Sequence, residues 1–362
     1  MDGILYSLFV HLTAESGSRK DIVSFFGGEK NVFEAGEDEW CFCPHISEKA
    51  LARMKRINGE YIEKIIRQCE ENDWQIITEN DEAYPAGLKM FDDSPGVLFV
   101  SGNPMALDGL ICVSGTRKIN EGGETACEKA ADAVHESGRK VLSFDTPGCD
   151  AAAIKYALTY GSVCMALAGG LGTSANRRLS LCVADMGAVV STFAPLEKPS
   201  PVYFHMRNRL ASRLCDAAII TQTDEKGNSL FVASQFRKAG KPVFAAAGSA
   251  GCDRLLNDYA YILRAPLENV ILSHSAGALQ LNAARKAPAK IKKEDKNNNN
   301  LDTLTQHSIL ASTILQECGG KTDMDELLLK SGLPMTEAMS AVTELELNGI
   351  AATDAGNRCI LL

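Results

Sequence analysis

"LICVSGTRKINEGGETACEKAADAVHESGRKVLSF", residues 110–144, decides the fold. It begins with an apolar run at 110–115, continues through an amphipathic stretch at 122–138 and ends in a second apolar run at 140–144. Two short strands joined by a helix form a βαβ unit, and the strands of such a unit are parallel. The segment therefore predicts a parallel sheet with a helix packed against it.

The same alternation continues from about residue 72 to residue 273. Further strand-like runs lie at 163–170, 188–193, 217–222 and 242–248, and a helical stretch occupies 229–240. This order is typical of the α/β class with a mostly parallel sheet. Ligands of such sheets bind beyond the carboxyl ends of the strands. The loops that we expect to meet there are 114–123, 145–150, 169–176, 193–209 and 223–229.

Composition favours a soluble, cytoplasmic protein with a sizeable core. Of the 362 residues, 45% are hydrophobic, and the formal net charge is −9. This charge argues against bulk electrostatic binding of duplex DNA. A local basic pocket remains compatible with it, because salt screens charges beyond about 8–10 Å. No apolar run reaches the ~18 residues of a membrane span, so we expect no membrane association.

The 12 cysteines are scattered and have no zinc-site spacing. We therefore expect no metal and no cofactor. Isolated cysteines among apolar residues usually pack as small buried hydrophobic groups, and this is the expectation for Cys112, Cys164 and Cys182.

The chain divides into four predicted regions. Residues 1–71 are mostly helical, with main segments at 5–13 and 48–72, and residues 72–282 carry the α/β pattern. Residues 283–300 are polar, end in an asparagine run and are typical of a flexible linker. Residues 301–362 contain three helical segments, 307–318, 324–332 and 335–350, followed by a hairpin at 350–362, which suggests a winged helix.

The 301–362 region is acidic, with nine carboxylates against three basic residues. A recognition helix with this charge would be repelled by phosphates. We therefore predict a role in protein contacts or regulation for this region.

The turn after the first buried strand is a candidate anion site. Ser114, Gly115 and Thr116 are small enough to let backbone N–H groups approach a phosphate at the start of a helix, and Arg117 adds a guanidinium suited to a phosphate. A tight turn with a solvated arginine explains the same residues equally well. At the start of the 229–240 helix, Asn228 and Ser229 offer either an anion site or a plain cap.

A local reversal of charge lies between residues 205 and 241. Seven basic residues face three carboxylates in this acidic chain. Arg209 and Arg213 are four residues apart, on one face of a predicted helix, and Arg207 lies near its start. A solvated helix face is the ordinary explanation, but the glycine- and serine-rich loops at the same sheet edge favour a ligand.

Catalytic signals are weak. The six histidines do not pair with an evident nucleophile, and there is no GxSxG elbow. The turn "AGGLGT" (168–173) resembles that of lysine-decarboxylase-like phosphoribohydrolases, but the carboxylate those enzymes place three residues further on is Asn176 here. We expect no enzyme.

Five segments together resemble the DNA-processing protein A family (DprA, also called Smf). They are 81–103, 113–117, 148–158, 204–220 and 227–248. The resemblance covers roughly residues 72–262 and extends weakly to both ends. It implies an extended Rossmann-like fold, with a helical N-terminal domain like those of the SAM or helix-hairpin-helix type and a C-terminal winged helix.

The resemblance also implies a function. Members bind single-stranded DNA, protect it during natural transformation, load the RecA recombinase onto it and act as homodimers without catalysis. Carried over by motif, the residues implied in phosphate contact or base stacking are Ser114, Gly115, Thr116, Arg117, Lys118, Phe204, Arg207, Asn208, Arg209, Asn228, Ser229 and Lys241.

Several family positions differ in this chain. The family's Ser-Gly-Leu-Ala is 143–146 here, with Phe144 in place of the glycine and an acid at Asp145. A family histidine is Ile154, and Gly227 replaces a serine. Three functions therefore stay open: a single-stranded DNA binder, a phosphoribohydrolase-like enzyme, and a scaffold that has lost its ligand and recruits protein partners.

Overall fold

The computed structural model describes residues 2–15, 17–161, 163–263 and 267–272, and beyond these only 314–315, 321–323, 327, 330, 341–342, 345, 351–353 and 358–361. The chain divides into two compact units, Met1–Ala287 and Pro288–Leu362. The predicted boundaries at 71, 282 and 300 stay predictions. No helix among these described residues is long and apolar enough to cross a membrane.

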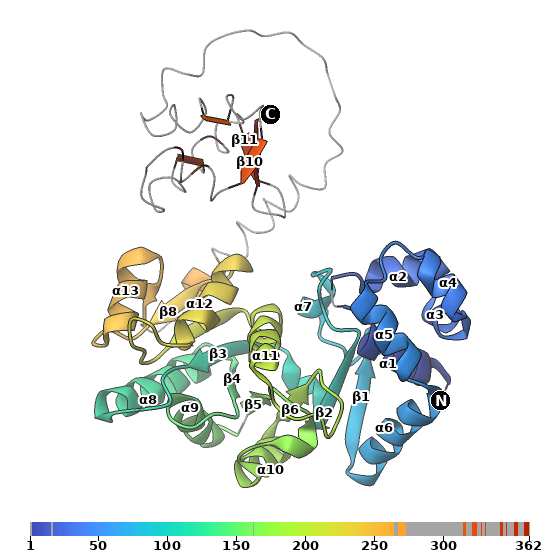
Figure 1. Ribbon diagram of the computed structural model, residues 1–362. Helices are drawn as coiled ribbons and strands as arrows, with labels where there is room; N and C mark the ends of the chain where they lie inside the picture. Colours follow the sequence, from blue (N-terminus) through green and yellow to red (C-terminus); the bar gives the residue numbers. More distant parts are fainter. Residues whose placement is uncertain are drawn as a thin grey trace. The chain divides into compact units, whose positions relative to one another are not determined.

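The first unit is built on a nine-stranded sheet of order β1-β2-β6-β5-β4-β3-β7-β8-β9 (Figure 1). Its strands are β1 (Trp74–Thr78), β2 (Val97–Gly102), β3 (Leu110–Ser114), β4 (Lys140–Phe144), β5 (Val163–Ala166), β6 (Ala188–Ser191), β7 (Ala217–Ile220), β8 (Val243–Ala245) and β9 (Tyr261–Ile262). The seven strands β6-β5-β4-β3-β7-β8-β9 are all parallel to their neighbours. Strand β2 is antiparallel to both of its neighbours, β1 and β6.

The mostly parallel α/β sheet and its six predicted strands are confirmed. The sequence reading missed β1, β2 and β9. Strand β9 has two residues, both exposed, and β1 is half-exposed, so neither carries the continuous apolar run of a central strand.

Strand β3 occupies the point where the chain changes direction. From β3 the chain adds β4, β5 and β6 on one side, and then returns to place β7 and β8 on the other. In sheets of this type the connections leave neighbouring strands in opposite directions at such a point and open a crevice at their carboxyl ends. The candidate site lies there.

Helices cover both faces of the sheet (Figure 1). One face carries α8 (Glu121–Glu136), α9 (Cys149–Leu158) and α10 (Arg177–Met186), and the other carries α7 (Ala86–Lys89), α11 (Pro201–Leu214), α12 (Ser229–Lys238) and α13 (Ala250–Asp258). Alternate residues of β3 divide between the two layers. Ile111 and Val113 pack on the first face, and Leu110 and Cys112 on the second, all with 0% exposure.

The N-terminal helices gather at the β1 edge of the sheet (Figure 1). They are α1 (Asp2–Thr13), α2 (Arg19–Phe26), α3 (Glu29–Glu34), α4 (Glu37–Phe42), α5 (Glu48–Arg56) and α6 (Gly59–Glu71). The helical character predicted for 1–71 is confirmed, although the 48–72 segment is two helices and α2, α3 and α4 were not predicted.

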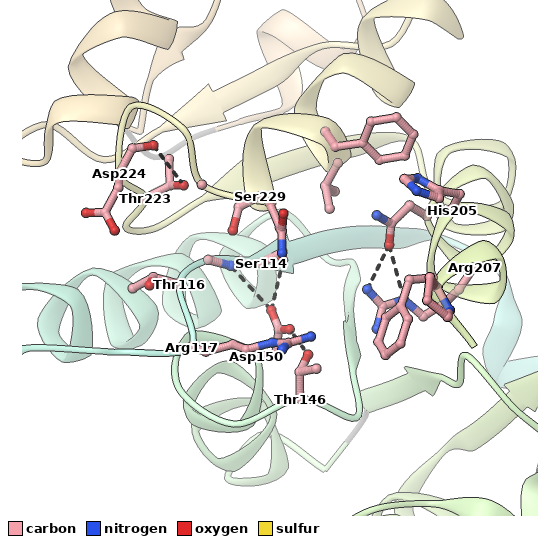
Figure 2. A pocket seen from close by; sticks show the side chains of 18 of the residues that line it. Ser114, Thr116, Arg117, Thr146, Asp150, His205, Arg207, Thr223, Asp224 and Ser229 are labelled. Carbon is pink, nitrogen blue, oxygen red and sulfur yellow. Dashed lines mark hydrogen bonds between the residues drawn. The ribbon is translucent and has the colours of Figure 1, made fainter. Parts of the chain in front are cut away.

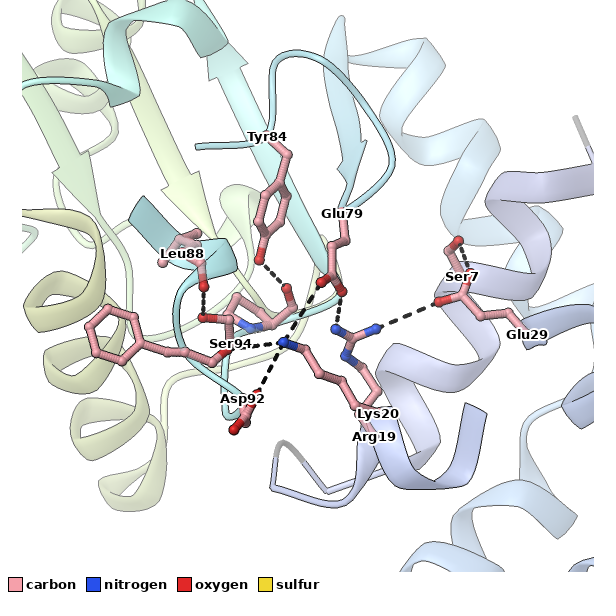
Figure 3. A network of polar contacts seen from close by, with 11 residues as sticks. Ser7, Arg19, Lys20, Glu29, Glu79, Tyr84, Leu88, Asp92 and Ser94 are labelled. Atoms are coloured by element: carbon pink, nitrogen blue, oxygen red, sulfur yellow. Dashed lines mark hydrogen bonds and ion pairs between the residues drawn. The ribbon is translucent and has the colours of Figure 1, made fainter. Parts of the chain in front are cut away.

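Arg19 ties these helices to the sheet. Its guanidinium donates to Glu79 just after β1 and lies 3.7 Å from Glu29 (Figure 3). A methyl group at position 96 would lie 3.0 Å from the Arg19 side chain, so the glycine at this position avoids a steric clash with Arg19. Arg19 itself is buried, and its ion pairs join the start of α2 to the edge of the sheet.

The cysteines follow the expected pattern with one exception. Cys112 and Cys164 are buried, as predicted, but Cys182 is exposed on α10. The prediction failed because Cys182 sits on the solvent face of that helix. The described residues contain no cluster of histidine, cysteine or carboxylate groups able to hold a metal.

The second unit contains a three-stranded antiparallel sheet of order β10-β12-β11. Its strands are β10 (Lys321–Asp323), β11 (Ala351–Thr353) and β12 (Arg358–Leu361). The hairpin predicted for 350–362 is confirmed by the pairing of β11 with β12. The predicted helices 307–318, 324–332 and 335–350 lie largely outside the described residues, and the winged helix stays a prediction.

Candidate functional site

A cavity of about 630 Å³ opens at the carboxyl ends of β3 and β7. Its walls are the turn 114–118, the loop after β4, the start of α11 and the start of α12 (Figure 2). The segments thus come from four separate βα connections, which the topology brings to one sheet edge.

Asp150 shapes one wall of the cavity. Its carboxylate accepts hydrogen bonds from the Ser114 hydroxyl at 2.8 Å, the Gly115 amide at 3.3 Å and the Thr146 hydroxyl (Figure 2). Burial raises the pKa of Asp150, and these donors and the positive charge of Arg207 oppose that rise. The carboxylate therefore links the turn after β3 to the start of α9 by hydrogen bonds.

The backbone of the turn is packed directly on α9. Gly148 has φ +83°, and a Cβ there would lie 2.3 Å from the Thr116 carbonyl oxygen. The Cys149 amide donates to that oxygen at 3.0 Å. The close approach explains why a glycine precedes α9.

The turn does not offer its amides in the way the sequence suggested. The Gly115 amide donates to Asp150, the Thr116 amide to the Gln222 carbonyl and the Lys118 amide to the Thr116 hydroxyl. These three N–H groups are already satisfied within the protein. An anion at this turn must therefore be held mainly by side chains, of which Arg117 and Lys118 are exposed.

Two helix N-termini contribute positive potential instead. Ser200, the N-cap of α11, and Asn228, the N-cap of α12, both line the cavity. Neither side chain caps its helix by a hydrogen bond in the described structure, contrary to the cap considered for Asn228. The first turns of the two helices thus present their dipoles to the cavity, which favours an anion there.

Phe204 lies between two guanidinium groups. Arg117 is 5.8 Å and Arg207 is 5.1 Å from the centre of its ring. Arg207 also lies 3.7 Å from the centre of the Phe144 ring and donates to the Asn208 side-chain oxygen at 3.1 and 2.8 Å. Phe144 at the end of β4, Arg207, Phe204 and the exposed Arg117 thus lie in contact one after the other.

Arg207 is the buried member of this series, with 6% exposure. Desolvation lowers its pKa to about 10, opposed by the negative charge of Asp150. It stays protonated at neutral pH and adds positive potential from beneath the cavity. Arg117, which is exposed, is the arginine that a ligand reaches from solvent.

Ten of the twelve residues implied by the family resemblance line this cavity. They are Ser114, Gly115, Thr116, Arg117, Lys118, Phe204, Arg207, Asn208, Asn228 and Ser229.

The remaining two, Arg209 and Lys241, lie elsewhere. Lys241 is half-buried and donates to the carbonyls of Arg213 and Cys215 at 2.9 and 2.6 Å, at the C-terminal end of α11. Burial lowers its pKa to about 8. Arg209 lies 3.7 Å from Asp93 on another side of α11. The sequence placed both near the cavity because it shows neither the direction of a side chain nor its partner.

Three contributors to the cavity were missed as site residues. They are Asp150, Thr146 and His205. His205 packs edge-on against Phe231 with ring centres 4.6 Å apart and forms part of the α11–α12 wall. The position of Asp150 four residues after Thr146, at the start of a helix, was the available signal.

Just after the glycine-rich turn 168–173, a carboxylate of the chain itself accepts hydrogen bonds from two backbone amides. Asp145 accepts from the Ala175 amide at 2.5 Å and from the Asn176 amide at 3.2 Å, at the start of α10. These are the amides that a nucleotide phosphate would use at this helix. The arrangement counts against the phosphoribohydrolase-like alternative.

Several known proteins resemble this chain in sequence and fold. The family model for DNA recombination-mediator protein A matches residues 75–273. The DNA processing protein DprA of Streptococcus pneumoniae is 30% identical over 197 residues, covering 51% of this chain and 68% of that protein. Protein Smf of Escherichia coli is 28% identical over 312 residues, covering 82% and 80%. The X-ray structure of DNA processing protein A from Streptococcus pneumoniae shares the fold with TM-score 0.62 and 23% identity, over 72% of this chain and 95% of that one.

Proposed function

The chain belongs to the DNA recombination-mediator protein A family, and from this membership and the cavity we propose that it binds single-stranded DNA in DNA processing. The cavity holds backbone phosphates, and the aromatic side chain at its rim stacks a base. We propose that the protein works by binding, without a catalysed reaction.

The observation that carries this proposal is the meeting of two uncapped helix N-termini with Arg117 beside an aromatic ring. The starts of α11 and α12 supply dipole potential for a phosphate, although Pro201 has no N–H and the amides of Tyr203 and Leu230 already donate to the Ser200 and Gly227 carbonyls. Phe204, half-buried between Arg117 and Arg207, supplies a π face. Proteins that bind single strands combine such a positively charged groove with an aromatic platform.

A single strand fits this site better than a duplex. Stacking on Phe204 requires an unpaired base, whereas the bases of a duplex are stacked on each other. The chain carries a net charge of −9, so its attraction for phosphates is confined to local sites rather than spread over a face. A duplex needs a long basic surface, and one exposed strand needs only a pocket.

We also propose the finer parts of the family's role: protection of incoming DNA in natural transformation, delivery of the strand to RecA recombinase, action as a homodimer, and a cytoplasmic location. Co-purification of RecA with the DNA-bound protein tests delivery. Light scattering of the purified chain tests the dimer, since a mass equal to one 38.9 kDa chain at micromolar concentration would contradict it.

The binding proposal is tested by fluorescence anisotropy of labelled oligo-dT across a series of salt concentrations. Each phosphate neutralised contributes about −0.7 to the slope of log K against log salt for a single strand. Arg117→Gln should therefore weaken binding and make the slope shallower by about 0.7. Lys129→Gln, which removes one charge from an exposed position of α8, is the matched control and should leave the slope unchanged.

Binding that does not depend on salt would overturn the proposal. Equal slopes for the wild type and Arg117→Gln would overturn the assignment of this cavity. A full-strength complex with a duplex and none with oligo-dT would contradict the preference for a single strand.

A further inference from the structure

A second cavity, of about 330 Å³, lies on another side of α11, between that helix and the N-terminal helices. Helix α5 contributes Arg53 and Arg56, and α11 contributes Tyr203, Arg209 and Arg213. The cavity shares α11 with the first site but none of its lining residues, and of the residues that line it the family resemblance assigns a role to Arg209 alone.

The lining of this cavity is strongly cationic. Five arginines line it against two carboxylates, Asp93 and Glu197. Asp93 lies between Arg209 and Arg213, 3.7 and 3.3 Å from their guanidinium nitrogens, and so partly neutralises both. Glu197 accepts from the Tyr203 hydroxyl at 2.9 Å. The lining arginines of α5, by contrast, form no ion pair within the described residues.

Arg53 carries the clearest sign of an unfilled role. Its Nε and Nη2 atoms are buried and have no hydrogen-bond partner in the described structure. A buried donor without an acceptor is unfavourable, and the penalty is larger when the group is charged. Arg56 lies one turn further along α5 and is exposed. An anion in the cavity would satisfy Arg53 and draw on both charges.

Other lining residues of the cavity include an uncharged histidine and an aromatic pair. The His11 imidazole, which also lines it, is bonded to the Thr192 carbonyl at 2.8 Å. Burial lowers the pKa of His11 to about 4, so it adds no charge at neutral pH. Phe193 and Tyr203 stack with ring centres 4.1 Å apart and form an apolar side wall. The fifth lining arginine, Arg19 of α2, is paired with Glu29 and Glu79, so the remaining positive charge of the lining lies on the arginines of α5 and α11.

We propose that this second cavity binds a phosphate group, held by Arg53 and Arg56 of α5 together with Arg209 of α11. Guanidinium groups match the geometry of phosphate oxygens and hold them by charge-assisted hydrogen bonds. The phosphate belongs either to a nucleic-acid strand that continues past α11 from the first cavity or to a small phosphorylated molecule. The first source rests on the proposed function, and the second does not.

The experiment uses the full chain and two double variants of equal charge. Arg53→Gln with Arg56→Gln removes two charges from the cavity, and Lys49→Gln with Lys55→Gln removes two from exposed positions of the same helix outside it. Pyrophosphate binding is measured by titration calorimetry at constant ionic strength. Binding of oligo-dT of about 4 and about 16 nucleotides, the span of single-strand binding sites, is measured by anisotropy.

We expect the arginine pair variant to lose roughly tenfold in affinity for one of these probes, while the lysine pair variant matches the wild type. Loss for pyrophosphate identifies a small-molecule site. Loss for the longer oligonucleotide alone, with the shorter one unaffected, identifies a second contact of the strand. Unchanged affinity for pyrophosphate and for both oligonucleotides overturns the proposal.

Two controls separate this site from the first cavity and from folding defects. Arg117→Gln should weaken binding of the short oligonucleotide and leave pyrophosphate binding unchanged. The experiment therefore distinguishes a wrong assignment of the first cavity from a wrong assignment of the second. Arg56→Gln alone changes only an exposed side chain and should still reduce affinity a few-fold. If Arg56→Gln has no effect and the folded pair variant binds like the wild type, the cavity is not a phosphate site.

Discussion

The guanidinium of Arg207 lies 3.7 Å from the centre of the Phe144 ring, at the end of β4. A glycine stands at this position in the family pattern, so the ring gives this chain a platform on which the arginine rests. Arg207 is therefore held beneath the cavity by Phe144 on one side and Asn208 on the other. In the proposed DNA site, Arg207 therefore acts through the electric field of its charge, and the exposed Arg117 makes the direct contact.

Phe144→Leu tests this pairing. Leucine keeps most of the buried volume but removes the π face, so we expect a loss of about 1 kcal/mol from packing and up to about 2 kcal/mol from the desolvated cation–π contact. Urea denaturation measures the free energy of unfolding. In an Arg207→Gln background the same substitution should cost at least about 1 kcal/mol less. Equal costs in both backgrounds would show that the two residues are not coupled.

Asp150 is predicted to hold the turn after β3. Asp150→Ala leaves the donors of Ser114, Gly115 and Thr146 without their acceptor, and we expect the free energy of unfolding to fall by about 3 kcal/mol or more. Oligo-dT affinity should fall too, because Arg117 follows this turn. Asp150→Asn keeps one acceptor oxygen and should retain most of both properties. An alanine variant as stable as the wild type would contradict this role.

Lys241 is predicted to stabilise the protein and to make no phosphate contact. Lys241→Met removes the donor to the Arg213 and Cys215 carbonyls, and the free energy of unfolding should fall by about 2 kcal/mol. The salt dependence of oligo-dT binding should stay unchanged, in contrast to Arg117→Gln. A slope that becomes shallower by about 0.7 would place Lys241 on the DNA instead.

His11 should make the fold sensitive to acid. Burial lowers its pKa from 6.5 to about 4 in the folded chain. Between these values the unfolded chain takes up a proton that the folded chain does not, so stability falls as the pH falls through this window. Between pH 7.5 and pH 5 the loss due to His11 is about 2 kcal/mol.

His11→Gln keeps an N–H donor for the Thr192 carbonyl but does not titrate. The variant should therefore lose about 2 kcal/mol less than the wild type over this pH range, as measured by urea denaturation at both pH values. Parallel losses in the two proteins would mean that His11 does not cause the acid sensitivity.

Much of the first site could be predicted from the chain alone. Apolar runs alternating with helices specify parallel strands, and parallel strands bring their carboxyl ends to one edge. The rule placed Ser114, Thr116 and Arg117 together with the starts of α11 and α12, as observed. It failed for Lys241, whose ammonium turns to carbonyls at the far end of α11.

The backbone chemistry of the turn was also beyond the sequence. Small residues at 114–116 indicate amides open to a phosphate, yet those of Gly115 and Thr116 are taken by Asp150 and Gln222. In the same way, Asp145 occupies the amides at the start of α10. These partners lie in other βα connections, so their contacts form only when the strands assemble.

The sequence by itself determined the alternation of the central strands and helices, the sheet edge where the first cavity lies and several of the residues that meet there. These properties follow from local periodicity and from the geometry of parallel strands. The tertiary structure alone decided that Arg207 lies on the Phe144 ring, that the Lys241 ammonium donates to backbone carbonyls and that Arg53 of α5 lines one cavity with the arginines of α11. Such pairings join side chains far apart in the chain, and their positions are set by packing, which no local pattern encodes.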